Sequence, residues 1–273
     1  MPASRRNAPG TTLSLDGEGK LAQDNRAGFV AYVMAGDGDT AQLLDRLPGA
    51  GADVIELGMP FTDPMADGPS IQAAAQRALD NGMTVKGTLS FTKAFRAKHA
   101  DTPLVLMGYA NPIHHYGWDA FARDASDAGV DGLICVDLPP EEDQPLREAL
   151  SRVGIAIIRL ATPTTNDHRL KTVAEGSSGF VYYVSTTGVT GAGMGAATDV
   201  GAAVARVRKA TGLPVVVGFG VRTPEAAQQI AAASDAVVVG SAIVSANHDG
   251  GAQAAIDLVE SLSAATHGAK RNA

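Results

Sequence analysis

The sequence predicts a (β/α)8 barrel, and two patterns support this fold class. Short apolar segments alternate with longer segments in which apolar residues recur at helical spacing, starting at Gly28. Gly, Pro or Asp stands at nearly every junction between the two kinds of segment. The chain has 273 residues, a length at which parallel α/β barrels form one domain. We expect a tail and a short N-terminal capping helix at 1–25, one barrel domain at 26–265 and a loose C-terminal tail at 266–273.

Eight apolar segments are expected to form the strands. They are apolar throughout rather than alternating in polarity, which is typical of parallel strands covered on both faces. Each repeat is close to the roughly thirty residues that a βαβ unit needs. The segments are 29–35, 53–59, 104–110, 132–138, 156–161, 180–185, 215–221 and 236–239. Such units can close into a barrel or form an open doubly wound sheet, and we favour one closed barrel because no linker divides them.

Helices are expected between these strands, where Ala, Leu and charged residues recur at helical spacing. Examples are 71–80, 118–128, 141–153 and 224–233. Three helix starts are marked by proline or acidic residues, which favour a helix N-terminus. These are Pro69-Ser70, Pro140-Glu-Glu-Asp143 and Thr223-Pro-Glu225.

The composition excludes several classes of function. The chain carries 22 basic and 29 acidic residues without a basic cluster, so we expect no nucleic-acid partner. No apolar segment is long enough for a signal peptide or a membrane span. The lone cysteine, Cys135, lies in an apolar segment and is predicted to be a buried structural thiol, which fits a cytoplasmic protein. The histidines lack metal-ligand spacing, and we expect no metal centre.

A glutamate inside the second predicted strand is the first candidate for catalysis. In such barrels the active site lies at the C-terminal ends of the strands. Glu56 is flanked there by Ile55 and Leu57. Burial should raise the pKa of its carboxyl group towards neutrality, which suits a general acid and base. The alternative is a structural glutamate paired with Lys or Arg of a neighbouring strand.

Two aspartates, Asp63 and Asp67, follow in a loop rich in Pro and Gly. Each alone is more often a turn or helix-capping residue than a catalyst. Two carboxyl groups in different environments near one pocket are, however, the usual way to obtain an acid and a base at one pH. We therefore expect one of the two aspartates to act together with Glu56.

Glycines follow the last two predicted strands, at Gly218-Phe219-Gly220 and at Gly240-Ser241. Glycines allow backbone N–H groups to approach an anion closely, and a short helix beginning at Ser241 would point its positive end at that anion. This is the commonest phosphate site of the fold. The alternative is two ordinary glycine turns.

The segment 185–195 is rich in glycine and hydroxyl groups, which is typical of a loop that closes over a ligand. Residues 191–196 also fit the dinucleotide pattern G-x-G-x-x-A. A dinucleotide site is not favoured, because no acidic residue ends a following strand and the pattern lies in the sixth unit rather than the first.

Several strings of the sequence together resemble the tryptophan synthase alpha chain family. They are Glu56-Leu-Gly-Met-Pro-Phe-Thr-Asp-Pro-Met-Ala-Asp-Gly-Pro69, Tyr109-Ala-Asn-Pro112, Tyr182-Tyr-Val-Ser-Thr-Thr-Gly-Val-Thr-Gly191, Gly218-Phe-Gly220 and Gly240-Ser-Ala-Ile-Val244. Their order and spacing hold from about Phe29 to Val244. The first string is highly specific, whereas Gly-Phe-Gly or Gly-Ser alone would be weak.

The resemblance implies a lyase of L-tryptophan biosynthesis that cleaves indole-3-glycerol phosphate into indole and glyceraldehyde 3-phosphate. By resemblance, Glu56 would be the general acid and base, and Asp67 would hold the indole N–H and stabilise positive charge on the ring. An apolar slot for indole would be lined by Tyr32, Ile71, Met107, Ile134, Tyr182 and Phe219. The phosphate would lie against Thr190, Gly191, Gly220, Gly240 and Ser241.

The resemblance also implies a partner, a beta subunit that carries pyridoxal phosphate in an alpha2-beta2 heterotetramer. This chain itself would need no cofactor. The loops 63–69 and 186–195 would form much of the surface between the subunits. Three positions depart from the family pattern and bear on the slot and the loop: Gly38 where proline is usual, Tyr32 where phenylalanine is frequent, and Thr186 where some members carry arginine.

Three alternatives to this function stay open at the level of sequence. Another phosphate-binding barrel enzyme would need a catalytic lysine or an aspartate pair at other strand ends, and the second to eighth predicted strands contain no lysine. A free-standing indole-3-glycerol-phosphate lyase would differ only in its independence of a beta subunit. An inactive barrel that serves as an activator or scaffold is disfavoured by the presence of Glu56 and Asp67.

Overall fold

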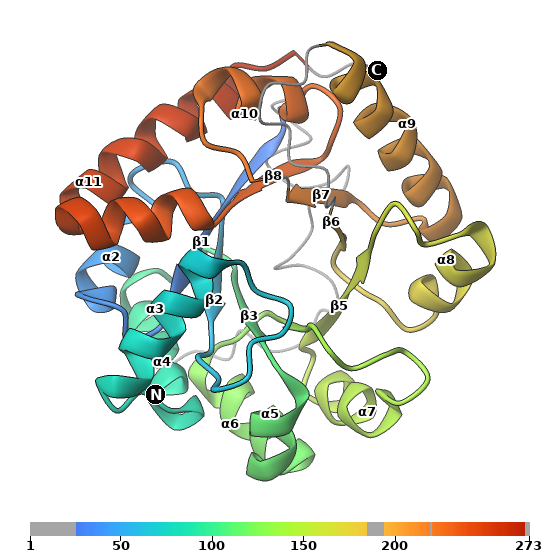
Figure 1. Cartoon of the computed structure of the whole chain (residues 1–273). Coiled ribbons are helices and arrows are strands. Elements are labelled where there is room, and N and C mark those ends of the chain that lie inside the picture. Colours follow the sequence, from blue (N-terminus) through green and yellow to red (C-terminus); the bar gives the residue numbers. More distant parts are fainter. Residues whose placement is uncertain (1–25, 185–193, 219, 271–273) are drawn as a thin grey trace.

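A computed structural model describes residues 26–184, 194–218 and 220–270. Its strands form one closed parallel barrel in sequential order, and β1 pairs with β8 (Figure 1). The strands are β1 Gly28–Met34, β2 Val54–Gly58, β3 Leu104–Gly108, β4 Gly132–Cys135, β5 Ala156–Ala161, β6 Val181–Val184, β7 Val215–Gly218 and β8 Ala236–Val239. The predicted (β/α)8 barrel is confirmed, and the pairing of β1 with β8 excludes the open sheet.

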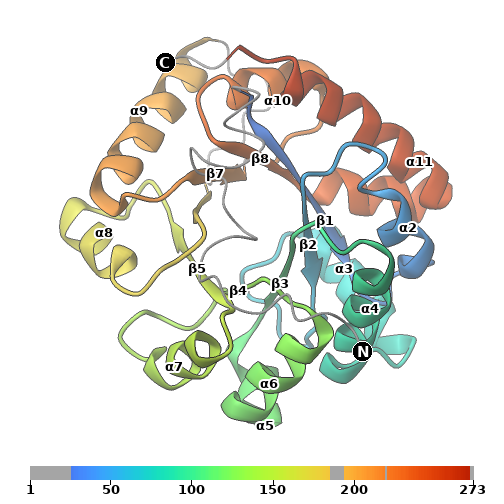
Figure 2. The same cartoon turned by 180° about the vertical axis from the view of Figure 1, so that it is seen from behind.

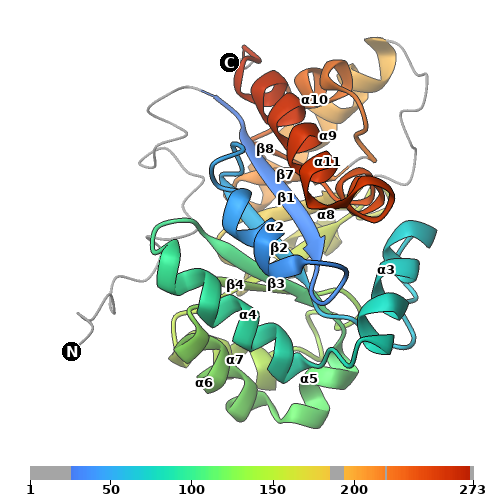
Figure 3. The same ribbon diagram turned by 90° about the vertical axis from the view of Figure 1, so that its left-hand side faces the viewer.

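Helices surround the barrel on the outside, as the views from both ends and from the side show (Figures 1, 2 and 3). They are α2 Thr40–Arg46, α3 Pro69–Asp80, α4 Val85–Lys98, α5 Ala110–Tyr116, α6 Trp118–Ala128, α7 Gln144–Arg152, α8 Asp167–Ala174, α9 Met194–Thr211, α10 Pro224–Ala231 and α11 Ser241–His267. None of these helices is long and apolar enough to cross a lipid bilayer. The predicted capping helix lies in 1–25, outside the described residues.

Side chains of the strands point alternately to the helices and to the barrel interior, because the side-chain period of a strand is two residues. The layer between strands and helices contains Leu57, Leu106 and Val217, among others. The interior cluster includes Val30, Val54, Val105, Ile134, Phe180 and Val216. Glu56 follows Val54 by two residues and Tyr32 follows Val30 by two, so both face the interior one layer closer to the C-terminal ends.

Aspartates close the opposite end of the barrel, where the strands begin. Asp53, Asp131 and Asp235 each precede an even-numbered strand. Each accepts a hydrogen bond from a backbone amide at the start of the strand before, and each forms an ion pair with an arginine. The amides are those of Phe29, Leu104 and Val215, and the arginines are Arg26, Arg96 and Arg208. Each aspartate thereby links the starts of two neighbouring strands and gives a backbone amide a hydrogen-bond partner.

The predicted loose C-terminal tail at 266–273 needs correction at its start, and 271–273 lie outside the described residues. Helix α11 continues to His267, and Thr266 is fully buried. The ring nitrogen Nε2 of His267 lies 2.8 Å from the carboxyl group of Asp53. The buried face of α11 continues past Ala264 and packs on the barrel. This burial stabilises the last turn of the helix, which Gly268 caps.

Candidate active site

The C-terminal ends of the strands bring together the inward-facing residues that the sequence singled out. Tyr32 on β1 is the register partner of Glu56 on β2. Met107 on β3 is in register with Ile134 on β4. In Figure 1 the loop from β2 to α3 lies on the near side of the barrel, over the strand ends. The predicted site residues of the first four strands therefore share one end of the barrel interior.

Glu56 is buried, with 1% of its surface exposed. Among the described residues, neither oxygen of its carboxyl group has a hydrogen-bond partner. Burial, followed by the charge of Asp67, raises the pKa of Glu56 to about 8. A glutamate paired with Lys or Arg would have a lowered pKa, so the structural alternative is not what the described residues form. At neutral pH this carboxyl group holds a proton that it can donate.

Asp67 lies in the loop between β2 and α3 and is partly exposed. Its Oδ2 atom accepts a hydrogen bond of 3.0 Å from the hydroxyl of Tyr109. Burial raises the pKa of Asp67, and the hydrogen bond from Tyr109 acts in the opposite direction. Asp63, the other candidate, is exposed and accepts a hydrogen bond of 2.6 Å from the neighbouring Thr62 hydroxyl. Of the two aspartates, Asp67 is the one whose charge acts on Glu56.

Tyr109 is a residue of the site that the sequence reasoning did not single out. It is 4% exposed and stands directly before α5. Its hydroxyl donates to Asp67 and accepts a hydrogen bond of 3.1 Å from the backbone N–H of Ala66. The available signal was its place as a polar-tipped residue at the end of the third predicted strand, inside the string Tyr109-Ala-Asn-Pro112.

Two further tyrosines face the carboxyl groups from β1 and β6. Tyr32 and Tyr182 are buried, and burial together with the charges of Glu56 and Asp67 raises the pKa of both phenols. Glycines make room for them. A Cβ atom on Gly58 would lie 2.2 Å from the Tyr32 hydroxyl, and one on Gly218 would lie 2.6 Å from the Tyr182 hydroxyl. Both phenols stay protonated at neutral pH and can act as hydrogen-bond donors.

The predicted apolar slot is formed in part by described residues. Ile71 on α3 packs in one cluster with Tyr32, and Met107 packs against both this cluster and the one that contains Ile134 and Tyr182. Phe219, the remaining predicted member, lies outside the described residues. The described part of the slot thus has flat aromatic and flexible apolar walls beside two carboxyl groups.

The predicted phosphate end lies at β7 and β8. Gly220 has a positive φ of +64°, and a Cβ atom there would meet open space. Gly240 caps α11, which begins at Ser241, and a Cβ atom on Gly240 would lie 3.4 Å from the ring of Tyr32. The helix that begins here is not short, but it kinks at Gly251, where φ is +73°. Thr190 and Gly191 lie outside the described residues.

Comparisons with known proteins identify the family of this barrel. The family model described as "Tryptophan synthase alpha chain" matches residues 19–271. The tryptophan synthase alpha chain of Phenylobacterium zucineum is 62% identical over 228 residues, which is 82% of this chain and 82% of that protein. The chain belongs to the tryptophan synthase alpha chain family.

Further relatives support the same assignment. The tryptophan synthase alpha chain of a Caulobacter species is 60% identical over 227 residues, 82% of each chain. A solved structure of tryptophan synthase from Mycobacterium tuberculosis has a chain with a TM-score of 0.86 and 38% identity, covering 94% of this chain and 99% of that one. The alpha chain from Legionella pneumophila gives a TM-score of 0.83 at 36% identity, covering 90% and 94%. Tryptophan biosynthesis is thus the assigned role, and the other phosphate-binding barrels are not favoured.

A buried aspartate secures the loop after β1 in this member of the tryptophan synthase alpha family. Asp37 is 5% exposed and forms two hydrogen bonds, of 2.7 and 2.8 Å, with the guanidinium group of Arg77 on α3. The side chain of Asn247 on α11 donates to its backbone oxygen over 3.2 Å. These contacts fasten the loop that contains Gly36-Asp37-Gly38 to α3 and α11. Arg77 and Asn247 were not predicted, because their roles depend on contacts distant in sequence.

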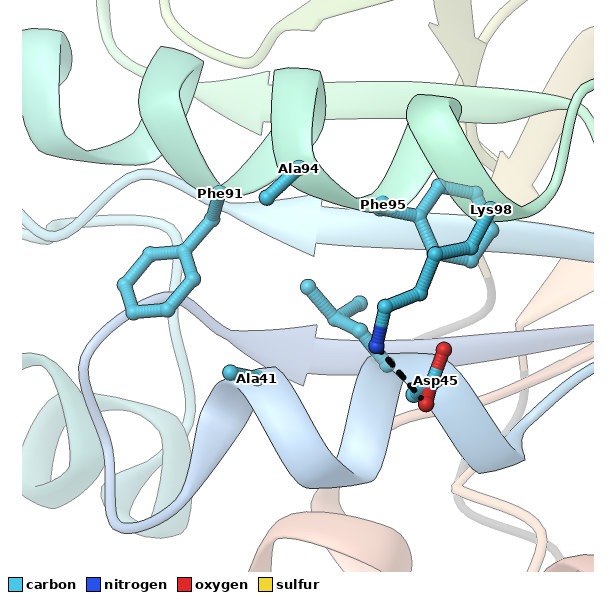
Figure 4. Close-up of a pocket in the computed structure, with 7 residues that line it drawn as sticks. Ala41, Asp45, Phe91, Ala94, Phe95 and Lys98 are labelled. Carbon is cyan, nitrogen blue, oxygen red and sulfur yellow. Dashed lines mark hydrogen bonds and ion pairs between the residues drawn. The ribbon is translucent and has the colours of Figure 1, made fainter.

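A small cavity between α2 and α4 lies outside the strand wall and away from the alpha-chain site (Figure 4). It is lined by Ala41, Leu44, Asp45, Phe91, Ala94, Phe95 and Lys98. Lys98 and Asp45 form an ion pair of 3.0 Å across it, and His99 also contacts Asp45. Because these charged groups are satisfied by one another, the cavity offers no unpaired polar group to a ligand.

Within the described ranges, no three His, Cys, Asp or Glu side chains gather as they would around a metal ion. Cys135 is buried, and burial raises the pKa of its thiol, as expected for the structural role predicted for it.

Proposed function

We propose that Glu56 and Asp67 divide the acid–base work in the cleavage of indole-3-glycerol phosphate. The neutral carboxyl group of Glu56 donates its proton to C3 of the indole ring, which leaves positive charge on the ring nitrogen. The Glu56 carboxylate then takes the proton of the neighbouring glycerol hydroxyl. The carbon–carbon bond breaks, its electron pair returns to the ring, and indole and glyceraldehyde 3-phosphate leave. Glu56 gives one proton and regains one.

The burial of Glu56 is the observation that carries this proposal. A carboxyl group with a pKa of about 8 and no hydrogen-bond partner among the described residues is protonated at neutral pH and ready to donate. Asp67, which holds a hydrogen bond from Tyr109, would be the ionised partner. Its carboxylate would accept the indole N–H and stabilise the positive charge that develops beside it.

The substrate would lie with its indole ring in the slot and its phosphate at the far end. Tyr32, Ile71, Met107, Ile134, Tyr182 and Phe219 would line the ring. Thr190, Gly191, Gly220, Gly240 and Ser241 would hold the phosphate. The start of α11 supports this orientation, because backbone N–H groups and the positive end of a helix favour an anion there.

A beta subunit that carries pyridoxal phosphate would be the partner, in a cytoplasmic alpha2-beta2 heterotetramer, and this chain would need no cofactor of its own. The loop from β2 to α3 supports such a contact. Met65 in this loop is 83% exposed, two residues from Asp67. An exposed methionine beside a catalytic loop suits a surface that is covered in an assembly.

Indole release by three variants tests the proposal. The full chain is incubated with indole-3-glycerol phosphate, with and without a beta subunit from a relative. Glu56→Gln and Asp67→Asn should each lower indole release by about 10²-fold or more, since acid–base groups contribute about that much. Glu142→Gln, at an exposed position before α7, is the matched control and should retain the wild-type rate.

The outcomes separate the alternatives. Near-normal turnover by Glu56→Gln would contradict its role as proton donor. No indole from the wild-type chain under either condition would favour the inactive scaffold. Equal rates with and without the beta subunit would favour a free-standing lyase.

A further inference from the structure

Tyr109 connects the loop between β2 and α3, which carries Asp67, to the end of β3. Its hydroxyl makes two hydrogen bonds to adjacent residues of the loop between β2 and α3. It donates to Oδ2 of Asp67 over 3.0 Å and accepts from the backbone N–H of Ala66 over 3.1 Å. One hydroxyl therefore fixes both the backbone of the loop and the carboxyl group that follows.

Tyr109 is itself held firmly. The next residue, Ala110, begins α5 and donates its backbone N–H to Oδ1 of Asp137, beyond β4, over 2.7 Å. The ring of Tyr109 is buried, and its centroid lies 5.3 Å from the ring centroid of Phe61 in the loop between β2 and α3. A chain of contacts thus runs from the end of β4, through the end of β3, to the loop after β2. The hydroxyl is presented to Asp67 by a rigid part of the fold.

The two carboxyl groups of the site differ in this contact as well as in burial. Neither oxygen of Glu56 has a hydrogen-bond partner among the described residues, whereas Asp67 receives the Tyr109 hydroxyl. We propose that Tyr109 is a positioning residue that holds Asp67 towards the substrate and keeps it the ionised member of the pair. This inference rests on the roles of Glu56 and Asp67 proposed above.

The charges around Asp67 fit this role. The charge of Asp67 acts on Glu56 on β2, Tyr32 on β1 and Tyr182 on β6, and Asp137 after β4 acts on Tyr109. All are acids, so none of them stabilises a negative charge on Asp67 through opposite charge. The hydrogen bond from Tyr109 lowers the pKa of Asp67 against the effect of burial. The pKa of the Tyr109 phenol is itself raised, first by burial, so the phenol remains a donor.

The test is the pH profile of kcat/KM for Tyr109→Phe, which removes the hydroxyl and keeps the ring against Phe61. The full chain is used under whichever condition, with or without a beta subunit, releases indole. Without its donor, Asp67 holds a proton to higher pH, so the acid limb of the profile should move up by about one pH unit. The alkaline limb belongs to Glu56 beside an already ionised Asp67 and should stay in place.

Tyr116→Phe is the matched control. Its hydroxyl also donates to an aspartate, Asp124, over 2.7 Å, but at the outer surface on α5 and α6. This variant should keep the wild-type profile. A purely structural role of Tyr109 would scale the whole profile without moving one limb. An unmoved acid limb in Tyr109→Phe would therefore overturn the inference.

A double variant separates this inference from the proposed function. If Tyr109 acts through Asp67, adding Tyr109→Phe to Asp67→Asn should change the residual kcat/KM less than about twofold, because coupled residues do not add. A further large loss would contradict the inference. Wild-type activity in Asp67→Asn alone would instead contradict the proposed role of Asp67.

Discussion

Glu56 keeps its proton at neutral pH because burial removes water from its carboxyl group and no described side chain replaces that water. The sequence predicted the direction of this pKa shift, since Ile55 and Leu57 flank the glutamate in a strand. The residue pattern by itself could not choose between Asp63 and Asp67, which only the family resemblance distinguished, because the choice depends on how the loop folds back over the barrel. Tyr109 was missed for the same reason, since its contact with Asp67 spans 42 residues.

Gly58 is a residue whose small size the site requires. A Cβ atom there would lie 2.2 Å from the Tyr32 hydroxyl and 2.8 Å from its Cζ. Gly58→Ala should lower the free energy of unfolding by about 1–3 kcal/mol, the usual cost of overpacking. Tyr32→Phe in the same chain should recover part of that loss, because it removes the nearest atom. Urea denaturation of the single and double variants measures both effects.

Gly201→Ala is the control for this prediction. Gly201 lies in α9, and its nearest new neighbour would be 3.8 Å away, an ordinary contact. This variant should be as stable as wild type or slightly more so, because alanine favours a helix. Equal stability of Gly58→Ala and wild type would show that the barrel end tolerates the extra carbon.

At the scale of elements, the order and type of the strands could be predicted, but several ends could not. The predicted third strand extended to residue 110, whereas β3 stops at Gly108 and α5 begins at Ala110. The predicted helix at 141–153 begins only at Gln144, and the side chain of Asp143 before it binds the guanidinium groups of Arg147 and Arg159 instead of capping the helix. Such ends are decided by long-range partners, which local patterns do not contain.

The aspartates at the strand starts give the barrel a pH-dependent part of its stability. Hydrogen bonds from Arg26, His267 and Phe29 lower the pKa of Asp53 to about 2, against the opposing effect of burial. A lowered carboxyl pKa stabilises the folded state above the unfolded pKa, and that stabilisation is lost as pH falls towards 2. Asp53→Asn should therefore lower the free energy of unfolding by about 2 kcal/mol at pH 7.

Urea denaturation at several pH values measures this effect. The difference between Asp53→Asn and wild type should shrink as pH falls from about 4 towards 2. Asp127→Asn, at an exposed position on α6, is the control and should differ little from wild type at any pH. A difference that stays constant down to the lowest pH would mean that the charge of Asp53 does not stabilise the fold.

At the scale of the whole molecule, eightfold repetition predicted a barrel, and the pairing of β1 with β8 closes it. Closure is what gives the interior two different ends. At one end, aspartate–arginine pairs join the strand starts. At the other end, Glu56 is enclosed by residues of β1, β3 and β6. This enclosure removes water from the carboxyl group of Glu56. The role of Glu56 as proton donor depends on this placement.

The most direct measurement is the titration of the Glu56 carboxyl group itself. The full chain is labelled with ¹³C at the glutamate side-chain carboxyl, and comparison with Glu56→Gln identifies the Glu56 signal by NMR. The structure predicts a midpoint near pH 8 for this signal. A midpoint near 4.5, the ordinary value for glutamate, would mean that Glu56 is solvated or paired and ionised at neutral pH, and would contradict its role as the proton donor.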